Sequence, residues 1–101
     1  MDRAQFYKEV YSIIKEIPYG NVSTYGKIAQ LIGKPQCSRM VGQALSHAPE
    51  EQHLPCHRVV NSQGRLVPGW QKQKELLEKE GITFKPNGCV NMPKHLWDTT
   101  G

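Results

Sequence analysis

The sequence predicts a compact α+β domain in which a helix-turn-helix packs against a further helix and small β-hairpins. Its 101 residues fit one domain with its own hydrophobic core. Apolar residues recur with helical spacing in the first half, and short apolar runs separated by Gly, Pro and Asn follow in the second half. With 38% apolar and 22% charged residues, the composition excludes a disordered or collagen-like chain. We therefore expect residues 1–101 to form a single domain.

The first half of the chain predicts three helices. The first covers residues 2–17 and ends at the turn formed by residues 18–21. The second begins after Ser23 or Thr24, both good N-caps, and ends at Gly33. The third runs from about residue 37 to residue 46. The last two helices have the outline of a helix-turn-helix, although ordinary α-hairpins share that outline. Phe6, Val10, Ile13, Ile14 and Ile17 form one apolar stripe on the first helix, the second carries Ile28, Leu31 and Ile32, and the inward residues of the third are Met40, Val41, Ala44 and Leu45.

The second half predicts two hairpins and one helix. After a polar loop at residues 48–54, residues 57–60 and 65–67 form a hairpin around the turn 61–64. A polar helix over residues 71–80 buries Leu76 and Leu77 and ends before Gly81. Residues 82–84 and 89–92 form a second hairpin, and the tail 94–101 packs back through Trp97.

The charge distribution favours a nucleic-acid partner. The chain has 13 basic and 9 acidic residues, a net charge of +4. Between Ile17 and Pro49 there is no acidic residue, while Lys27, Lys34 and Arg39 lie in that stretch. A basic surface without carboxylates suits phosphate contacts, which release counterions. On charge alone, an ordinary solvated surface explains the pattern equally well.

The sequence also limits where the protein works. A mean hydropathy of −0.58 and the lack of an 18-residue apolar run exclude a membrane span. Charges stand where a signal peptide needs apolar residues, so we expect a cytoplasmic protein, associated with the nucleoid in a bacterial cell. Cys37, Cys56 and Cys89 are odd in number and form no CxxC pair, which argues against a disulfide framework.

Residues 54–60 carry the densest chemistry in the chain. Cys56 becomes a nucleophile if a neighbouring base or cation lowers its pKa, and His57 and Arg58 follow it directly. His57 at the next position would act through a bridging water, and Glu80 is a candidate carboxylate to orient it. Spacing alone favours the alternative of a buried, inert Cys56 beside a surface histidine.

A metal site is the weaker alternative for this segment. His53, Cys56 and His57 could combine with Cys37 or His47. They lack the paired short spacings of zinc modules, so we expect no metal.

Three motifs in register resemble a known family. They are GNVSTYG at Gly20–Gly26, SRMVGQAL at Ser38–Leu45 and PCHRV at Pro55–Val59. The chain is similar over residues 4–84 to the DNA-binding domain of O6-alkylguanine-DNA alkyltransferases, the methylated-DNA–protein-cysteine methyltransferases. The resemblance implies a winged-helix-like fold, a monomer, no cofactor and double-stranded DNA containing O6-alkylguanine as the partner.

The resemblance also implies roles for the reactive residues. Cys56 matches the alkyl acceptor, His57 the water-bridged base and Glu80 the carboxylate behind it. We expect His57 and Glu80 to favour the thiolate, and Arg58 to make a structural contact. Tyr25 matches a tyrosine that turns the DNA phosphate and lies near guanine N3.

The third helix enters the minor groove in that family, and Arg39 matches the arginine that fills the gap left by the flipped base. The expected DNA contacts are Arg39, Ser23, Thr24, Tyr25, Ser38 and Gln43. The expected base pocket is formed by Leu45, Cys56, Val59 and Trp70, with the carbonyls of Cys56 and Val59 reading the guanine amino group.

Three departures from the family pattern leave two hypotheses. We expect no N-terminal domain, Ala48 replaces the asparagine that braces the active-site turn, and the pocket loop at Pro68–Trp70 is short. These features are similar to alkyltransferase-like proteins, which bind alkylguanine but lack the cysteine. The first hypothesis is therefore irreversible transfer of the alkyl group to Cys56. The alternative is a non-enzymatic protein that flags the lesion for another pathway, with nucleotide excision repair proteins as partners. A transcription-factor-like reader of the major groove has little support.

Overall fold

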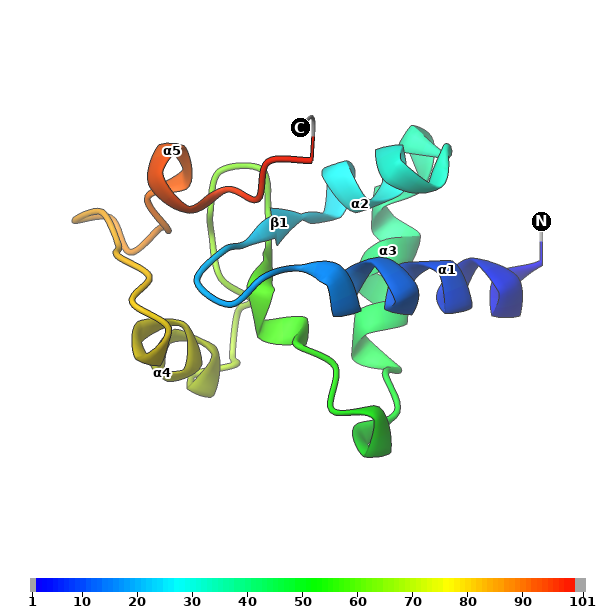
Figure 1. Cartoon of the computed structure of the whole chain (residues 1–101), viewed down its shortest axis with the longest axis horizontal. Helices are drawn as coiled ribbons and strands as arrows, with labels where there is room; N and C mark the ends of the chain where they lie inside the picture. Colours follow the sequence, from blue (N-terminus) through cyan, green and yellow to red (C-terminus); the bar gives the residue numbers. More distant parts are fainter. Residues whose placement is uncertain (1, 100–101) are drawn as a thin grey trace.

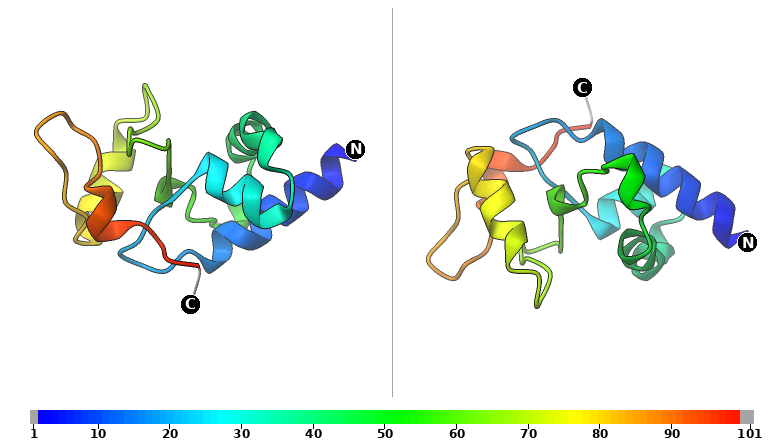
Figure 2. Two further views of the ribbon diagram at one scale, coloured as in Figure 1. Left: turned by 90° about the horizontal axis from the view of Figure 1, so that it is seen from above. Right: turned by 90° about the horizontal axis from the view of Figure 1, so that it is seen from below.

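The computed structural model describes residues 2–99 and places the helices in two groups (Figure 1). Helices α1, α2 and α3 lie at one end of the molecule, while α4 and α5 lie at the other, and both views in Figure 2 preserve this separation. The helices are α1 (Arg3–Glu16), α2 (Tyr25–Ile32), α3 (Ser38–Ser46), α4 (Lys72–Lys79) and α5 (Met92–His95). The strands are β1 (Ser23–Thr24) and β2 (Val59–Val60), and 3-10 turns cover Pro35–Cys37, Glu50–Gln52 and Cys56–Arg58.

The first three helices confirm the sequence prediction, and local caps set the start of α1 and both ends of α2. The carboxylate of Asp2 accepts a 3.0 Å hydrogen bond from the backbone N–H of Ala4 at the start of α1. The hydroxyl of Thr24 accepts a 3.0 Å bond from the N–H of Lys27 and caps α2. Gly33 ends α2 in the left-handed conformation, with φ of 87°.

The two strands correct the predicted hairpin at residues 57–67. β2 pairs in parallel with β1, with Ser23 opposite Val59 and Thr24 opposite Val60. Within residues 2–99, residues 65–67 form no strand. Val59 and Val60 are both fully buried, so the strand is covered on both faces, as short parallel strands usually are.

Two apolar clusters lie on opposite sides of this strand pair. Successive residues of a strand point to opposite faces, and Val59 belongs to the first cluster whereas Val60 belongs to the second. The first cluster contains Phe6, Val10, Ile14, Ile17, Ile28, Ala29, Cys37, Val41, Ala44 and Val59. The second contains Val22, Val60, Leu77, Ile82 and Val90. The strands therefore join the two groups of helices.

The C-terminal part folds back onto β1. Helix α4 is confirmed, although only Leu77 is fully buried and Leu76 is partly exposed. The second hairpin reduces to an antiparallel bridge between Phe84 and Val90. Met92, predicted to be in that hairpin, instead begins α5.

Beyond α5, Leu96 pairs with Val22, and Trp97 packs against the first cluster as expected. Residues 100 and 101 of the predicted tail lie outside the described residues. Among residues 2–99, the helices are too short or too polar to span a membrane.

Gly64, in the loop after β2, lies close to the C-terminal part of the chain, and this close approach leads to the first prediction. Its φ is +87°, and a Cβ atom there would lie 2.7 Å from the carbonyl oxygen of Val90. Gly88 has the same φ, but its Cβ would meet no atom within 4 Å. Gly88→Ala should cost about 1–2 kcal/mol for the left-handed backbone. Gly64→Ala should cost about 1–3 kcal/mol more, because the methyl group overlaps the backbone.

Urea unfolding of the two variants measures this difference directly, because the backbone conformation is matched. Equal destabilisation by Gly64→Ala and Gly88→Ala would show that the contact between Gly64 and Val90 is not tight.

Candidate functional site

A mainly apolar pocket of about 520 Å³ opens between α2, α3 and the loop before α4. Tyr25 begins α2, Leu45 belongs to the last turn of α3, Cys56 begins a 3-10 turn and Trp70 precedes α4. Leu45, Cys56 and Trp70 line this pocket as predicted, together with Tyr25, whereas Val59, also predicted there, is fully buried and does not line it. The complete lining is Tyr25, Gly42, Leu45, Ser46, Ala48, Pro49, Glu50, His53, Leu54, Cys56, Val67 and Trp70.

The thiol of Cys56 is partly buried in a tight turn. The N–H of Cys56 donates to the carbonyl of Leu54 at 2.8 Å, and its own carbonyl accepts from Val59. Burial raises the pKa of the Cys56 thiol, and a hydrogen bond with its own backbone only partly opposes this. The expected preference for the thiolate is therefore reversed in the protein without DNA, because the surroundings of the sulfur are apolar.

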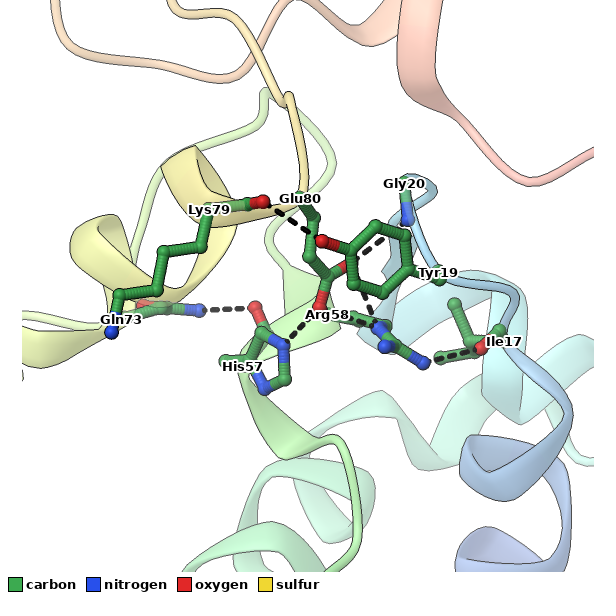
Figure 3. A network of polar contacts seen from close by, with 8 residues as sticks. All are labelled: Ile17, Tyr19, Gly20, His57, Arg58, Gln73, Lys79 and Glu80. Atoms are coloured by element: carbon green, nitrogen blue, oxygen red, sulfur yellow. Dashed lines mark hydrogen bonds and ion pairs between the residues drawn. The ribbon is translucent and has the colours of Figure 1, made fainter.

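Glu80 directly follows α4 and binds both residues after Cys56 (Figure 3). His57 Nε2 and Glu80 Oε2 are 2.6 Å apart, and Arg58 Nε donates to both carboxylate oxygens at 3.0 Å. Only 5% of the Glu80 side chain is exposed. The expected contact between His57 and Glu80 is present.

The Glu80 carboxylate stays charged because its neighbours compensate for burial. Burial raises its pKa, but hydrogen bonds from Gly20, His57 and Arg58 and the charge of Arg58 outweigh that effect. The net result is a Glu80 pKa below its usual value. The N–H of Gly20 donates to Oε1 at 2.8 Å.

Arg58 has the structural role expected from the sequence. Besides Glu80, it donates to the carbonyl of Ile17 at 2.8 Å, and its guanidinium lies 5.6 Å from the ring centre of Tyr19. The hydroxyl of Tyr19 in turn donates to the carbonyl of Lys79 at 2.8 Å (Figure 3). These contacts attach the end of α1 to the end of α4.

Gln73 is a supporting residue that the sequence analysis missed. Its side chain is fully buried, accepts from the N–H of Val67 at 2.7 Å and donates to the carbonyls of His57 and Val59 at 3.1 Å. Val59 therefore lies in the core with its carbonyl already bonded, and its role in reading guanine stays a prediction. A glutamine in a highly charged helix gives no sequence signal for this role.

The predicted DNA contacts fall into two groups. Arg39 and Gln43 are exposed on α3 and, four residues apart, share one face of that helix. Ser38 and Tyr25 are partly buried, and burial raises the pKa of Tyr25. Thr24 already caps α2.

Ser23 does not fit the predicted DNA contact. Its side chain is fully buried in β1, and its hydroxyl has no hydrogen-bond partner in the structure. The burial follows from the pairing of Ser23 with Val59, which places it inside the domain.

The rim of the pocket contains polar residues that sequence reasoning did not assign to it. His53 and Glu50 are exposed, and His53 has φ of 50°, the left-handed region. Ala48, which the resemblance matches to an asparagine of the family, also lines the pocket. Non-glycine residues rarely adopt a positive φ, and the residue type of His53 gives no indication that it does so.

Glu80→Gln generates the second prediction. Because the folded-state pKa is lowered, the charge stabilises the fold above the unfolded glutamate pKa of about 4.3 and loses this effect as pH falls through the folded-state value. Glu80→Gln should cost about 3 kcal/mol at neutral pH, because Arg58 loses its partner carboxylate. The difference from wild type should shrink towards pH 3.

Thermal unfolding between pH 3 and 7 tests this, with Glu78→Gln on the exposed surface of α4 as control, expected within about 0.5 kcal/mol of wild type. If Glu80→Gln is less stable than wild type by the same amount at every pH, the loss of stability comes from the shape of the side chain and not from the Glu80 charge.

Comparison with known proteins gives the family. Residues 5–82 match the model of the 6-O-methylguanine DNA methyltransferase DNA-binding domain. Alkyltransferase-like protein 1 of Schizosaccharomyces pombe is 43% identical, over 92% of this chain and 94% of its own length. A methylated-DNA–protein-cysteine methyltransferase of Methanosarcina acetivorans is 44% identical over 76% of this chain, which spans about half (51%) of that relative.

A solved structure agrees over almost the whole chain. The crystal structure of the S. pombe alkyltransferase-like protein, in complex with damaged DNA containing O6-carboxymethylguanine, has a TM-score of 0.85. It is 42% identical and covers 97% of this chain and 99% of its own. Since the motifs, the fold and the family model agree, the chain belongs to the family of the 6-O-methylguanine DNA methyltransferase DNA-binding domain.

Proposed function

We propose that this protein binds duplex DNA containing O6-alkylguanine, holds the flipped base in its pocket and transfers the alkyl group to Cys56. The observation that carries the proposal is the position of the thiol, which lines the same pocket as Tyr25, Leu45 and Trp70. At about 520 Å³ the pocket has the size of a small-molecule site, for which the usual range is about 300–1,000 Å³.

DNA approaches α3 in this proposal. Arg39 and Gln43 are exposed on that helix, whose residues Gly42 and Leu45 also line the pocket. Extruding a base costs a few kcal/mol of stacking, and an inserted arginine offsets that cost by bonding the unpaired partner base. The S. pombe relative, solved with damaged DNA, supports this partner.

The reaction needs the thiol, a proton acceptor and a leaving guanine. The thiol proton moves through a bridging water to His57, whose contact with Glu80 stabilises the added charge. The sulfur forms a bond to the alkyl carbon while the bond from that carbon to guanine O6 breaks. The electron pair stays on guanine, and Tyr25 donates towards N3. The product thioether is stable, so each molecule reacts once.

A second function is lesion binding without transfer, which flags the base for excision repair proteins. Two observations favour it: burial raises the pKa of Cys56, and the chain matches the alkyltransferase-like relative over 94% of that relative's length. The resemblance also implies that Ala48, which lines the pocket, stands in place of a bracing asparagine, and a 1 Å misplacement of a reacting group can cost about 100-fold in rate.

Mass spectrometry after incubation with an O6-methylguanine duplex separates the two functions. Transfer predicts that the protein gains one methyl group and that peptide mapping locates it on Cys56, not on Cys37 or Cys89. Cys56→Ser should bind the same duplex normally and gain no mass. Tight binding by a wild-type protein that stays unmodified would instead establish the flagging function.

Arg39→Ala tests the approach of DNA. We expect the preference for the O6-methylguanine duplex over the undamaged duplex to fall by about tenfold, part of the unstacking cost of a few kcal/mol. Arg3→Ala removes the same charge from an exposed position on α1 and should leave that preference unchanged. Fluorescence anisotropy with both duplexes measures it. An unaltered preference in Arg39→Ala would refute the insertion of Arg39.

A further inference from the structure

Gln73 connects two parts of the pocket through one buried side chain. Its Oε1 accepts from the N–H of Val67 at 2.7 Å, and its Nε2 donates at 3.1 Å to the carbonyls of His57 (Figure 3) and Val59. Val67 lines the pocket, and His57 directly follows Cys56, which lines it too. Because Gln73 is fully buried, water does not compete for these three bonds.

The pocket wall before α4 is a closed turn that begins at Val67 and ends at Trp70, here called the loop wall. The N–H of Trp70 donates to the carbonyl of Val67 at 3.2 Å. Between them lie Pro68 and Gly69, and Gly69 has φ of 84°, the pattern of a type II β-turn. The backbone N–H of Gln73 donates to the carbonyl of Trp70 at 3.2 Å. Gln73 therefore binds the first residue of the loop wall with its side chain and the last residue with its backbone.

The arrangement around Gln73 requires a primary amide. The N–H of Val67 can only donate, and the carbonyls of His57 and Val59 can only accept. The buried end of the side chain must therefore supply one acceptor and two donors. A carboxylate has no donor, a lysine ammonium has no acceptor, and asparagine is one methylene shorter. An apolar side chain of similar size fills the space and makes none of the three bonds.

We propose that Gln73 is a positioning residue that fixes the loop wall relative to the turn of Cys56, and so sets the shape of the pocket around a bound base. Val67, Trp70 and Cys56 line the same pocket, so a shift of the loop wall changes the space next to the thiol. The consequence for the lesion rests on the proposed function, whereas the attachment of the loop wall does not.

Amide hydrogen exchange followed by NMR tests the attachment without DNA. In Gln73→Met, the N–H groups of Val67 and Trp70 should exchange about tenfold faster relative to other buried amides, as expected for the loss of about one hydrogen bond. Leu77→Ala is the matched control, because Leu77 is fully buried one helical turn further along α4. It should speed the exchange of buried amides in general, without singling out Val67 and Trp70.

Binding to O6-methylguanine and undamaged duplexes measures the consequence for the pocket. Gln73→Met should lower the preference for the lesion about tenfold, the lower end of what one methylene contact contributes in an apolar pocket. Leu77→Ala should keep the preference of wild type, because it removes packing from the second apolar cluster and no bond to the loop wall.

Gln73→Glu separates the hydrogen bonds of the amide from its size. A protonated carboxyl group keeps one donor and one acceptor, whereas a carboxylate faces the carbonyls of His57 and Val59 without a donor. Burial raises the pKa of a carboxyl group in this position, so it ionises between about pH 5.5 and about pH 8. Relative to wild type at the same pH, the lesion preference of Gln73→Glu should therefore be close to normal at the lower pH and fall at the higher one.

Three results would overturn the inference. One is exchange of Val67 and Trp70 that is no faster in folded Gln73→Met than in Leu77→Ala. The second is an unchanged lesion preference in Gln73→Met, and the third is the same relative preference in Gln73→Glu at both pH values. If the variants do not fold, wild type provides the test, because its Val67 N–H must exchange as slowly as the buried amides of α4. Exchange of that N–H as fast as in an unstructured peptide would overturn the inference.

The same measurements distinguish this inference from the proposed function. If wild type shows no preference for the lesion while the exchange of Val67 and Trp70 responds to Gln73, the proposed function fails and the attachment of the loop wall stands. If wild type prefers the lesion and transfers its methyl group, while neither exchange nor preference responds to Gln73, the positioning role fails alone.

Discussion

The buried carboxylate of Glu80 is the interaction on which the rest of the structure depends. A nearly dry carboxylate is strongly unfavourable without partners, and here three separate segments supply them. His57 and Arg58 come from the turn before β2, and Gly20 comes from the turn before β1. Because these segments are more than 20 residues from Glu80 in the chain, the ion pair fixes the relative positions of α1, β2 and α4.

The hydrogen bonds of the Glu80 carboxylate also position the thiol of Cys56, through the backbone of the turn that follows it. Cys56 begins the turn whose next two residues bind Glu80, and Gln73 bonds the carbonyl of His57 from α4. Val59 and Val60 then continue the turn into the strand pair and anchor it in both apolar clusters. The backbone of this turn thus holds the sulfur beside the polar network around Glu80. The surroundings of the sulfur in the pocket are apolar.

The parts of the fold that were predictable from sequence are those with local physical causes. Helices α1 to α3 follow from apolar spacing and from caps such as Thr24. The partner of β2 was not predictable, because a two-residue strand has no alternation to read, and Val59 pairs with Ser23 by tertiary packing. Helix α5 is a single turn with proline near its start, too short for a periodic signal.

In the candidate site, too, some features were predictable from the sequence and others were not. The resemblance located Tyr25, Cys56 and Trp70, and the structure places them in one pocket. The direction of the thiol pKa could not be predicted, because it depends on burial that the motif does not encode. Gln73 was missed for a related reason: it donates to backbone carbonyls distant in sequence, and a backbone carbonyl carries no residue identity.

The proposed binding and the proposed transfer would depend on different parts of this molecule. The exposed residues expected at the DNA, Arg39 and Gln43, belong to α3. The groups expected to move the proton, His57 and Glu80, belong to the polar network between β2 and α4. The pocket, lined by residues of α3 and by Cys56, lies between them, so under the proposed function a change in the polar network would weaken transfer while leaving the exposed face of α3 intact. In this chain the pocket contains the thiol of Cys56 together with Ala48, where the resemblance implies a bracing asparagine, so under the proposed function the rate of transfer should be affected more than the affinity for the lesion.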